Sequence, residues 1–524
     1  MVSLRSFCIA NGSFVSSRAG VMGSGPVPTP RVTDARAARV PPWRQGRCAR
    51  VRHARRRLAG RGAGLLVALA TTWAVFARGA NAVEITISAG DQARPAGPVS
   101  WAPATRLDAQ QAYFLVAENE KPVPAQLDEQ GRLWWWAAPM DAGQSRTYRI
   151  ETRPAAEAKP RVTFEREGGD RINVLIDGKL FTSFHFGKDV PKPFLYPVIG
   201  PTGRPVTRDY PLKDNPIEKA PAPGAKTRQD HPHHRSIWTA HGDVRMGDFS
   251  RPGSNYWNEV AEKGTAEAGA RIVKPENNDC EKVKSVGRTG GAVFGRIVAE
   301  IEWVNKAGRR ELTEERTYTF FAGDDSTRII DQKSVYRFPD GDVMFADTKE
   351  GGLVSVRMAV TMDEIGAAGR HGQMCNSNGQ VGEKQCWGKP ADWCDYVGPV
   401  DGDTLGIAIM DAPGNFRHPE PWHIRGYGLF TANPFGLKEF TGDKTRDGSK
   451  VWKKGETAEF NYRILIHKGD TKAARVAEAY SLFADPPKVA AKQAGISPRR
   501  PSAATEHGRA GGRHAERSEA SGFS

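Results

Sequence analysis

The chain has 524 residues, a formal net charge of +15 and 39% hydrophobic residues. Its positive charge is concentrated at the two ends, because residues 1–82 hold fourteen arginines and one acid and residues 487–524 carry a net charge of +4. The span between them carries about −2. The high pI therefore does not indicate nucleic-acid binding, and no nucleic-acid partner is expected.

Residues 1–82 have the order of an export signal. A basic segment at 52–61 precedes an apolar run at 62–77, and small residues at 79–82 offer a cleavage site. The apolar run is shorter than the roughly twenty residues that a membrane span requires. We expect residues 1–82 to contain an upstream extension from a misassigned start codon followed by a signal peptide. The mature chain is then exported, periplasmic or secreted, with no later membrane span.

Residues 83–153 predict a small β-sandwich. Short runs of β-branched and aromatic residues alternate there with turn residues, and one run contains Trp134, Trp135 and Trp136. Such a triplet could form a sugar-stacking platform, but one or two rings in the core and one at a domain boundary is the favoured interpretation. Residues 154–160 read as a proline-containing linker.

Residues 161–486 contain many long strands with alternating polarity and no βα alternation, which predicts a large antiparallel β-sandwich. An Asp-Gly pair at 177–178 indicates a hairpin turn. Residues 472–486 have helical spacing and predict one C-terminal helix. The fold class is therefore all-β, a small sandwich followed by a large one, and the polar tail at 487–524 is expected to be disordered.

Four cysteines lie outside the excluded N-terminal segment: Cys280, Cys375, Cys386 and Cys394. An exported protein keeps its disulfides, so the spacing favours a staple, Cys375 with Cys386 or Cys386 with Cys394. Zinc ligation is the less favoured alternative because no CxxC pair is present.

The stretch QDHPHHRSIWTAHGD at 229–243 holds four of the twelve histidines. Three interpretations compete: acid–base groups, ligands of a zinc-type metal site made by His231, His233 and His241, or hydrogen-bonded structural residues. The acid–base interpretation is favoured, and no metal is expected. It assigns proton transfer to His234 and His241 and substrate contacts to His231, His233, Arg235 and Asp243.

Two further segments carry candidate site residues. RHPEPWHIRGYGLFTANPFG at 417–436 suits recognition of a polyhydroxylated ligand, or forms an ordinary surface loop. Glu350, beside paired glycines in FADTKEGG, is the preferred carboxylate partner, with Glu383 in reserve. The substrate-binding candidates from these regions are Trp393, His423, Arg425 and Asn433. The phosphate-loop, GxSxG, HExxH and dinucleotide motifs are absent, so no cofactor is expected.

Four motifs carry a resemblance to a known family: DHPHHRSIWTAHGDV, FADTKEGG, WGKPADWCDYVGPVDG and RHPEPWHIRGYGLFTANPFG. Together they resemble the PmoA-like family of exported bacterial proteins over about residues 83–485. That family takes its name from a multi-span methane oxygenase subunit, whereas this chain has no span after its signal. The resemblance implies a fold similar to the supersandwich of sugar mutarotases, enzymes that use histidine and glutamate as acid and base.

The sequence therefore predicts an exported protein that binds a carbohydrate or sugar acid. An enzyme that works by His/Glu proton transfer, as an epimerase, lyase or hydrolase, is the first hypothesis. A non-catalytic carbohydrate-binding protein is the second, and a metalloprotein with histidine ligands is the third. The oligomeric state is left open.

Overall fold

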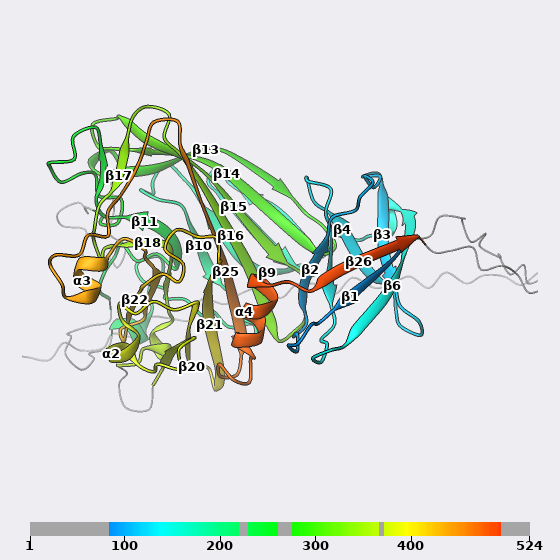
Figure 1. Cartoon of the computed structure of the whole chain (residues 1–524). Coiled ribbons are helices and arrows are strands. Elements are labelled where there is room, and N and C mark those ends of the chain that lie inside the picture. The colour runs from blue at the N-terminus through cyan, green and yellow to red at the C-terminus, as the bar shows by residue number, and fades with distance from the viewer. Residues whose placement is uncertain (1–82, 220–228, 260–274, 366–370, 494–524) are drawn as a thin grey trace, which may run out of the picture. The chain divides into compact units, whose positions relative to one another are not determined.

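The structure is a computed structural model that describes residues 83–219, 229–259, 275–365 and 371–493 (Figure 1). By residue contacts the chain separates into residues 1–75 and 76–524. The first unit and the predicted signal peptide lie outside the described residues. The described part is built almost entirely from antiparallel strands, so the predicted all-β class is confirmed. None of its helices is long and apolar enough to cross a membrane.

The region predicted as a small sandwich forms a seven-stranded antiparallel sheet with the order β2-β5-β4-β3-β6-β1-β26. Along its strand β5, Trp135 is fully buried, while Trp134 lies on the other face against Phe294 and Phe321. As predicted, one tryptophan of the triplet lies in the core of this sheet and another packs against the following β region. The strands are β1 (Val83–Ser88), β2 (Gly97–Trp101), β3 (Gln111–Val116), β4 (Val123–Leu127), β5 (Leu133–Ala137), β6 (Ser145–Pro154) and β26 (Lys488–Gln493).

Strand β26 corrects the prediction that all of residues 487–524 are disordered. It pairs with β1 over six residues, from Val83 opposite Gln493 to Ser88 opposite Lys488, and Figure 1 shows the two strands side by side. Its sequence KVAAKQ has little β propensity, so the pairing depends on the edge that β1 offers. Residues 494–524 lie outside the described part.

The region from residue 161 onward contains two eight-stranded antiparallel sheets. The first has the order β22-β23-β18-β11-β10-β9-β8-β7, and the second has the order β13-β14-β15-β16-β25-β21-β20-β19. The first comprises β7 (Val162–Glu167), β8 (Arg171–Ile176), β9 (Lys179–His185), β10 (Phe194–Val198), β11 (Ile237–His241), β18 (Gly351–Arg357), β22 (Trp422–Arg425) and β23 (Leu429–Ala432). The second comprises β13 (Cys280–Thr289), β14 (Phe294–Val304), β15 (Arg310–Phe321), β16 (Thr327–Arg337), β19 (Gln373–Asn376), β20 (Trp393–Val400), β21 (Asp403–Asp411) and β25 (Thr457–Lys468).

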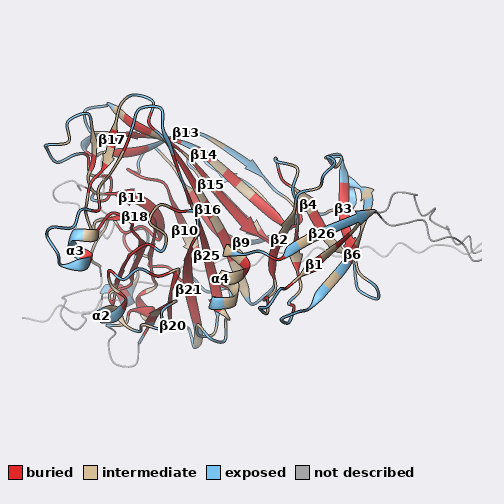
Figure 2. Ribbon diagram, in the orientation of Figure 1, coloured by how far each residue is buried: buried red, intermediate tan, exposed pale blue. Residues whose placement is uncertain are grey.

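One hydrophobic core contains residues of both sheets, so they form the predicted large sandwich (Figure 2). The alternating polarity of the strands determines which face of each sheet turns toward the core. On β14, for example, the buried Ile297, Ala299 and Ile301 alternate with more exposed neighbours. The predicted Asp-Gly turn joins β8 to β9, with φ of 50° at Asp177 and 75° at Gly178. A third, small sheet contains β12 (Val244–Met246), β17 (Val343–Phe345) and β24 (Lys450–Trp452).

The predicted C-terminal helix is present as α4 (Val476–Ala484), with Val476 and Leu482 buried. The described residues also contain three shorter α-helices that the sequence did not indicate: α1 (Pro216–Lys219), α2 (Glu383–Cys386) and α3 (Leu437–Thr441). Each is four or five residues long, too short to produce a helical hydrophobic period. The described residues also include three short 3-10 segments: η1 (Ala155–Glu157), inside the predicted linker, η3 (Pro275–Asn277) and η4 (Val360–Met362).

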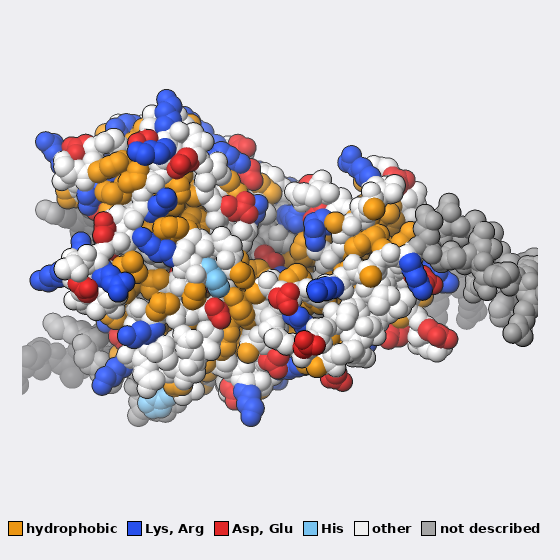
Figure 3. Space-filling model, viewed as in Figure 1, with side chains coloured by type: hydrophobic (Ala, Val, Ile, Leu, Met, Phe, Trp, Pro, Cys, Tyr) orange, Lys and Arg blue, Asp and Glu red, His pale blue; other side chains and the backbone are white. Residues whose placement is uncertain are grey.

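The four cysteines of the described region are free thiols, so the staple that the spacing favoured is not formed in this structure. Cys386 and Cys394 belong to the main core, and burial raises the pKa of Cys386 to about 12. The surface that Figure 3 shows has acidic and basic side chains interspersed over the strands.

Strand β26 should contribute to stability through its inward side chain. Val489 packs against the core of the N-terminal sheet, whereas Ala490 is exposed. Replacing Val489 with lysine should lower the free energy of unfolding by about 1–2 kcal/mol, because apolar contact is lost and a charge is brought to the core edge. Ala490→Lys is the matched control and should change it by less than about 0.5 kcal/mol. Urea denaturation measures both, and equal effects would contradict the pairing.

Candidate functional site

The histidine stretch is a turn that leads into a central, buried strand. His231 and Ser236 have positive φ values of 48° and 54°, and the amide of His234 donates to the carbonyl oxygen of His231 at 2.9 Å. The chain then enters β11, whose five residues are all buried between β10 and β18. A turn that is fixed at both ends holds its side chains in defined positions, which a binding or catalytic site requires.

Four aromatic rings form a continuous stack that joins two distant parts of the sequence. Tyr427 lies on His231 with ring centroids 5.0 Å apart, His231 lies on His234 at 4.8 Å, and His234 lies on Trp238 at 5.2 Å. The rings are nearly parallel, at angles of 5°, 3° and 18°. The histidine stretch and the 417–436 segment are therefore in direct contact.

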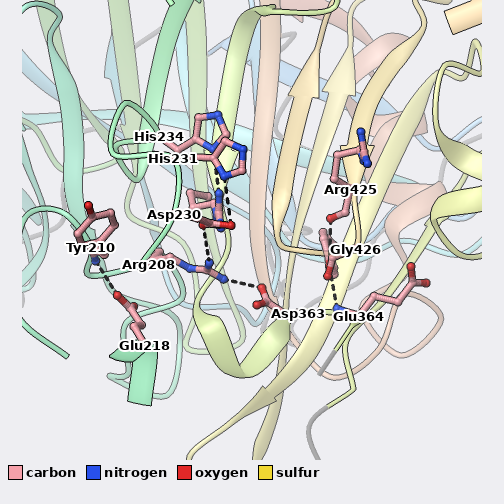
Figure 4. A network of polar contacts seen from close by, with 12 residues as sticks. Arg208, Tyr210, Glu218, Asp230, His231, His234, Asp363, Glu364, Arg425 and Gly426 are labelled. Carbon is pink, nitrogen blue, oxygen red and sulfur yellow. Dashed lines mark hydrogen bonds and ion pairs between the residues drawn. The ribbon is translucent and has the colours of Figure 1, made fainter. Parts of the chain in front are cut away.

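His231 lies beside the carboxylate of Asp230. Its Nδ1 lies 3.2 Å from Oδ2 of Asp230, and its side chain is 38% exposed. Nη2 of Arg357 donates to Oδ1 of the same aspartate at 2.5 Å, and Arg208 lies 3.9 Å away (Figure 4). Although burial acts in the opposite direction, His231 and these guanidinium groups hold the pKa of Asp230 well below its usual range. Asp230 is thus a carboxylate at neutral pH.

His234 lies beneath His231 and is neutral. Burial, with help from neighbouring positive groups, lowers its pKa well below the ordinary value. Its Nδ1 accepts a hydrogen bond from Nη1 of Arg357 at 2.9 Å, so the proton of the neutral ring is on Nε2. That Nε2 is buried and has no hydrogen-bond partner in the described structure.

His423, on β22, is the second buried imidazole of the site. Its Nδ1 donates to the carbonyl oxygen of Lys349 at 2.8 Å, which leaves Nε2 as an acceptor without a protein partner among the described residues. Burial, followed by the charges of Lys349 and Arg425, lowers the pKa of His423 to about 3. His231 also acts electrostatically on this ring, so the two histidines are neighbours.

Two ion pairs lie beside these rings. Lys349 pairs with Glu350, and Nε of Arg425 lies 2.7 Å from Oε1 of Glu383. The guanidinium carbon of Arg425 lies 5.4 Å from the centre of the Tyr427 ring, so the Arg425–Glu383 pair lies beside the aromatic stack. Burial raises the pKa of Tyr427 to about 12.

We call the half-exposed members the rim and the buried members the floor of the His231 site. The rim side chains are 26–38% exposed. The rim consists of Asp230, His231, Lys349, Glu350, Glu383 and Arg425. The floor consists of His234, Arg357, His423 and Tyr427. Asp230, His234 and Tyr427 contact His231 directly. Arg425 lies over the Tyr427 ring, and the Lys349–Glu350 pair joins the site through the hydrogen bond between His423 and the carbonyl oxygen of Lys349.

His241, a predicted acid–base residue, is sealed in the core. Its Nε2 donates to the carbonyl oxygen of Ala346 at 2.9 Å, and its ring stacks on Phe345. The remaining nitrogen faces Gly351 so closely that a Cβ there would lie 2.7 Å from it. Gly351 thus leaves room for His241, and Gly352 leaves room for Thr431 and Ser355, rather than for a ligand. His241 cannot exchange protons with a substrate in this arrangement.

Arg235, predicted to bind substrate, is committed to a buried ion cluster. Its guanidinium binds Glu259 through three contacts of 2.6–3.1 Å, and Nζ of Lys192 lies 2.9 Å from the same carboxylate. All three side chains are at most 9% exposed. The arginine therefore neutralises a buried glutamate and is not available to a ligand.

Three other predicted binding residues have structural partners. Asp243 binds Arg245 through both oxygens, and Nδ2 of Asn433 donates to the carbonyl oxygens of Thr348 and Lys349. Trp393 belongs to a separate hydrophobic cluster. The sequence grouped these residues with the site because polar and aromatic types recur in its motifs, and such types also serve as structural pairs.

His233 lies beside the stack, with its ring 4.4 Å from that of His234. Burial lowers its pKa to about 3. The metal alternative needed His231, His233 and His241 to converge, but His241 is packed against Phe345 and Phe435 instead. Within the described ranges, no group of three or more His, Cys, Asp or Glu side chains is arranged to hold a metal ion.

The structure adds residues that the sequence did not single out for the site. Arg357 is the most important, since it binds both Asp230 and His234, yet in the run LVSVRM it resembles an ordinary strand arginine. Asp230 begins the histidine stretch and could have been recognised from that position. A hollow of about 430 Å³ lined by Glu300, Arg310 and neighbouring residues lies elsewhere, on β14 and β15.

Arg235 provides a test of structural against binding roles. Arg235→Leu should lower the free energy of unfolding by about 3 kcal/mol, because Glu259 stays buried with only part of its compensation. The control Arg337→Leu breaks an exposed pair with Glu315 and should cost less than about 1 kcal/mol. Denaturant titration measures both. Unchanged stability of Arg235→Leu would mean that the arginine is available to a ligand.

Acid should destabilise the fold through its buried imidazoles. Burial lowers the pKa of His241 to about 4, whereas an unfolded histidine titrates near ~6.5. Between these values the unfolded state binds more protons, so the free energy of unfolding falls as the pH falls, by at most ~1.4 kcal/mol per pH unit for each such histidine.

Denaturation curves at several pH values between 7.5 and 4.5 give this slope. His241→Phe should lower the number of protons taken up on unfolding, which this slope measures, by up to one. His371→Gln replaces an exposed histidine and serves as the control. An unchanged slope in His241→Phe would show that His241 is already protonated in the folded protein.

Comparisons with known proteins give a family but no activity. No curated protein matches the chain. Among solved structures, the galactose 1-epimerase from Lactobacillus acidophilus NCFM is similar with a TM-score of 0.27 and 9% identity, over 60% of this chain and 100% of that chain. Similarity at this level does not indicate a shared function. The resemblance to PmoA-like proteins stays a prediction. A family model described as "Family of unknown function (DUF6807)" matches residues 171–481, more than half of the chain, and the protein therefore belongs to the DUF6807 family.

Proposed function

We propose that this protein is an exported carbohydrate-active enzyme in which His231 transfers protons. The observation that carries the proposal is the half-exposed His231, whose Nδ1 lies against the Asp230 carboxylate while its ring is held between Tyr427 and His234. Export is part of the proposal because of the signal-like order of residues 52–82.

The chemistry follows from the Asp230–His231 pair. The Asp230 carboxylate 3.2 Å from Nδ1 favours by its charge the tautomer of His231 with the proton on that nitrogen, although the two atoms are not hydrogen-bonded in this structure. In that tautomer Nε2 has a lone pair that accepts a proton. The same carboxylate stabilises the imidazolium that forms. Nδ1 is the buried edge of a side chain that is 38% exposed, so access is from the other edges. Arg357 and the ring stack limit reorientation, which favours catalysis.

Glu350 supplies the second titratable group. It lies on the rim, 35% exposed, and its charge acts on Tyr427, the ring that covers His231. A histidine and a carboxylate on one surface can remove and return a proton at a hydroxyl or at a carbon, or assist cleavage of a glycosidic bond. The reaction is an epimerisation, elimination or hydrolysis. The predicted role of His241 is dropped, and His234 becomes a hydrogen-bond donor instead of a proton carrier.

A polyhydroxylated ligand suits the polar groups at the site. Lys349 and Arg425 offer donors, while Glu350 and Glu383 offer acceptors. A sugar hydroxyl both donates and accepts, so neighbouring hydroxyls satisfy such alternating groups.

The test is turnover of a carbohydrate panel by purified variants. His231→Ala and Asp230→Asn should each reduce turnover at least about 100-fold, because the proton carrier or its orienting group is lost. Binding, measured by the ligand-induced rise of the melting midpoint, should weaken much less. The exposed His371→Ala is the control and should behave as the wild type.

Two results would contradict the proposal. Turnover that survives in His231→Ala would remove His231 from catalysis. A wild-type protein that binds panel members but alters none of them would favour the non-catalytic binding protein.

A further inference from the structure

We infer that the His231 site takes an uncharged sugar and discriminates against sugar acids. This inference rests on the proposed function and narrows its ligand class. It comes from the pairing of charges: every cation that the described residues contribute to the site already has a carboxylate partner within the site. A sugar acid, by contrast, needs a cation that is free to receive its carboxylate.

The two rim cations are both engaged. Nζ of Lys349 is hydrogen-bonded to Glu350, its neighbour in sequence. Nε of Arg425 pairs with Oε1 of Glu383 at 2.7 Å, and Oε2 of Glu383 accepts from the amide of Gly426 at 2.5 Å. Glu383 is therefore held from two sides, so its removal from Arg425 would break two interactions at once.

The buried cations are engaged as well. Arg357 donates to Asp230 at 2.5 Å and to His234 at 2.9 Å. Arg208 binds Asp363, and both of these side chains are only 1% exposed. Arg357 and Arg208 thus balance Asp230 and Asp363 beneath the rim, and neither provides a cation facing outward.

An incoming carboxylate would meet this arrangement at a cost. It would have to approach the partly exposed Asp230, Glu350 and Glu383, and like charges repel strongly at a partly buried site because the effective dielectric there is lower than in water. Otherwise it would have to displace one of them from its cation. Hydroxyl groups pay neither cost, because they can donate to a carboxylate and accept from its partner cation.

The experiment compares matched sugar pairs that differ only at one carbon: galactose with galacturonic acid, glucose with glucuronic acid and mannose with mannuronic acid. Each pair is tested as the monosaccharide and as a short oligomer, with affinity measured by calorimetry at pH 7. For the wild type, we expect at least one neutral member to bind about 10-fold or more tightly than its acid.

Charge-releasing variants make the test specific. Glu383→Gln keeps the shape of the side chain but frees Arg425, and Glu350→Gln frees Lys349. Each should shift the ratio of the neutral-sugar affinity to the sugar-acid affinity about 10-fold toward the acid, since the freed cation can form a charge-assisted hydrogen bond with the carboxylate. The control Glu459→Gln frees Lys333 in an exposed pair on β25 and β16 and should leave the ratio unchanged.

The outcomes separate the inference from the proposed function. If the wild type binds an acid as tightly as its neutral counterpart or more tightly, the inference is overturned while the carbohydrate function stands. An unchanged ratio in both Glu383→Gln and Glu350→Gln also overturns it, because selectivity would not depend on these pairs. If no sugar of either kind binds, the proposed function fails and the inference fails with it.

Discussion

The site depends on one buried guanidinium. Arg357 is only 1% exposed, and it bridges Asp230, which orients the half-exposed His231, and His234, which supports that ring from below. Burying a guanidinium charge is costly unless acceptors lie nearby, and on β18 both terminal nitrogens of Arg357 have one, although its Nε has no hydrogen-bond partner among the described residues. The turn before β11 provides both acceptors. The need of Arg357 for acceptors therefore holds Asp230 and His234 in place and keeps the proton of His234 on Nε2.

The sandwich brings separate motifs together through strand order. In the first large sheet, β11 lies next to β18, and β18 lies next to β23, although β11 and β18 are more than a hundred residues apart in the chain. The histidine turn before β11 and the Arg425–Leu429 end of the β22–β23 hairpin thus lie at the end of β18 that carries Arg357, whereas the segment before β18 starts at its other end. Neighbouring strands hold these segments more rigidly than loops would, which suits a site that must orient a proton carrier.

Burial divides the histidines into two chemical classes. His233, His234, His241 and His423 are kept neutral by the loss of solvation, whereas His231 keeps solvent access and a carboxylate partner. These five imidazoles thus include one candidate proton carrier, and the others act as neutral hydrogen-bonding and packing groups. This division explains how histidines can be concentrated in a core without a large cost in stability.

The sequence by itself determined the all-β class, most of the long strands of the two large sheets and the Asp-Gly turn, because alternating polarity and turn chemistry are local properties. It also identified the two segments that meet at His231. It did not indicate β10, β22 or β23 as strands. Only the tertiary structure decided that Arg357 belongs to the site, that Arg235 neutralises Glu259, that His241 is sealed behind Gly351, and that residues 488–493 pair with β1. Each of these depends on what lies opposite a residue across the fold, and a residue's own neighbours in the chain carry no record of partners a hundred or more positions away.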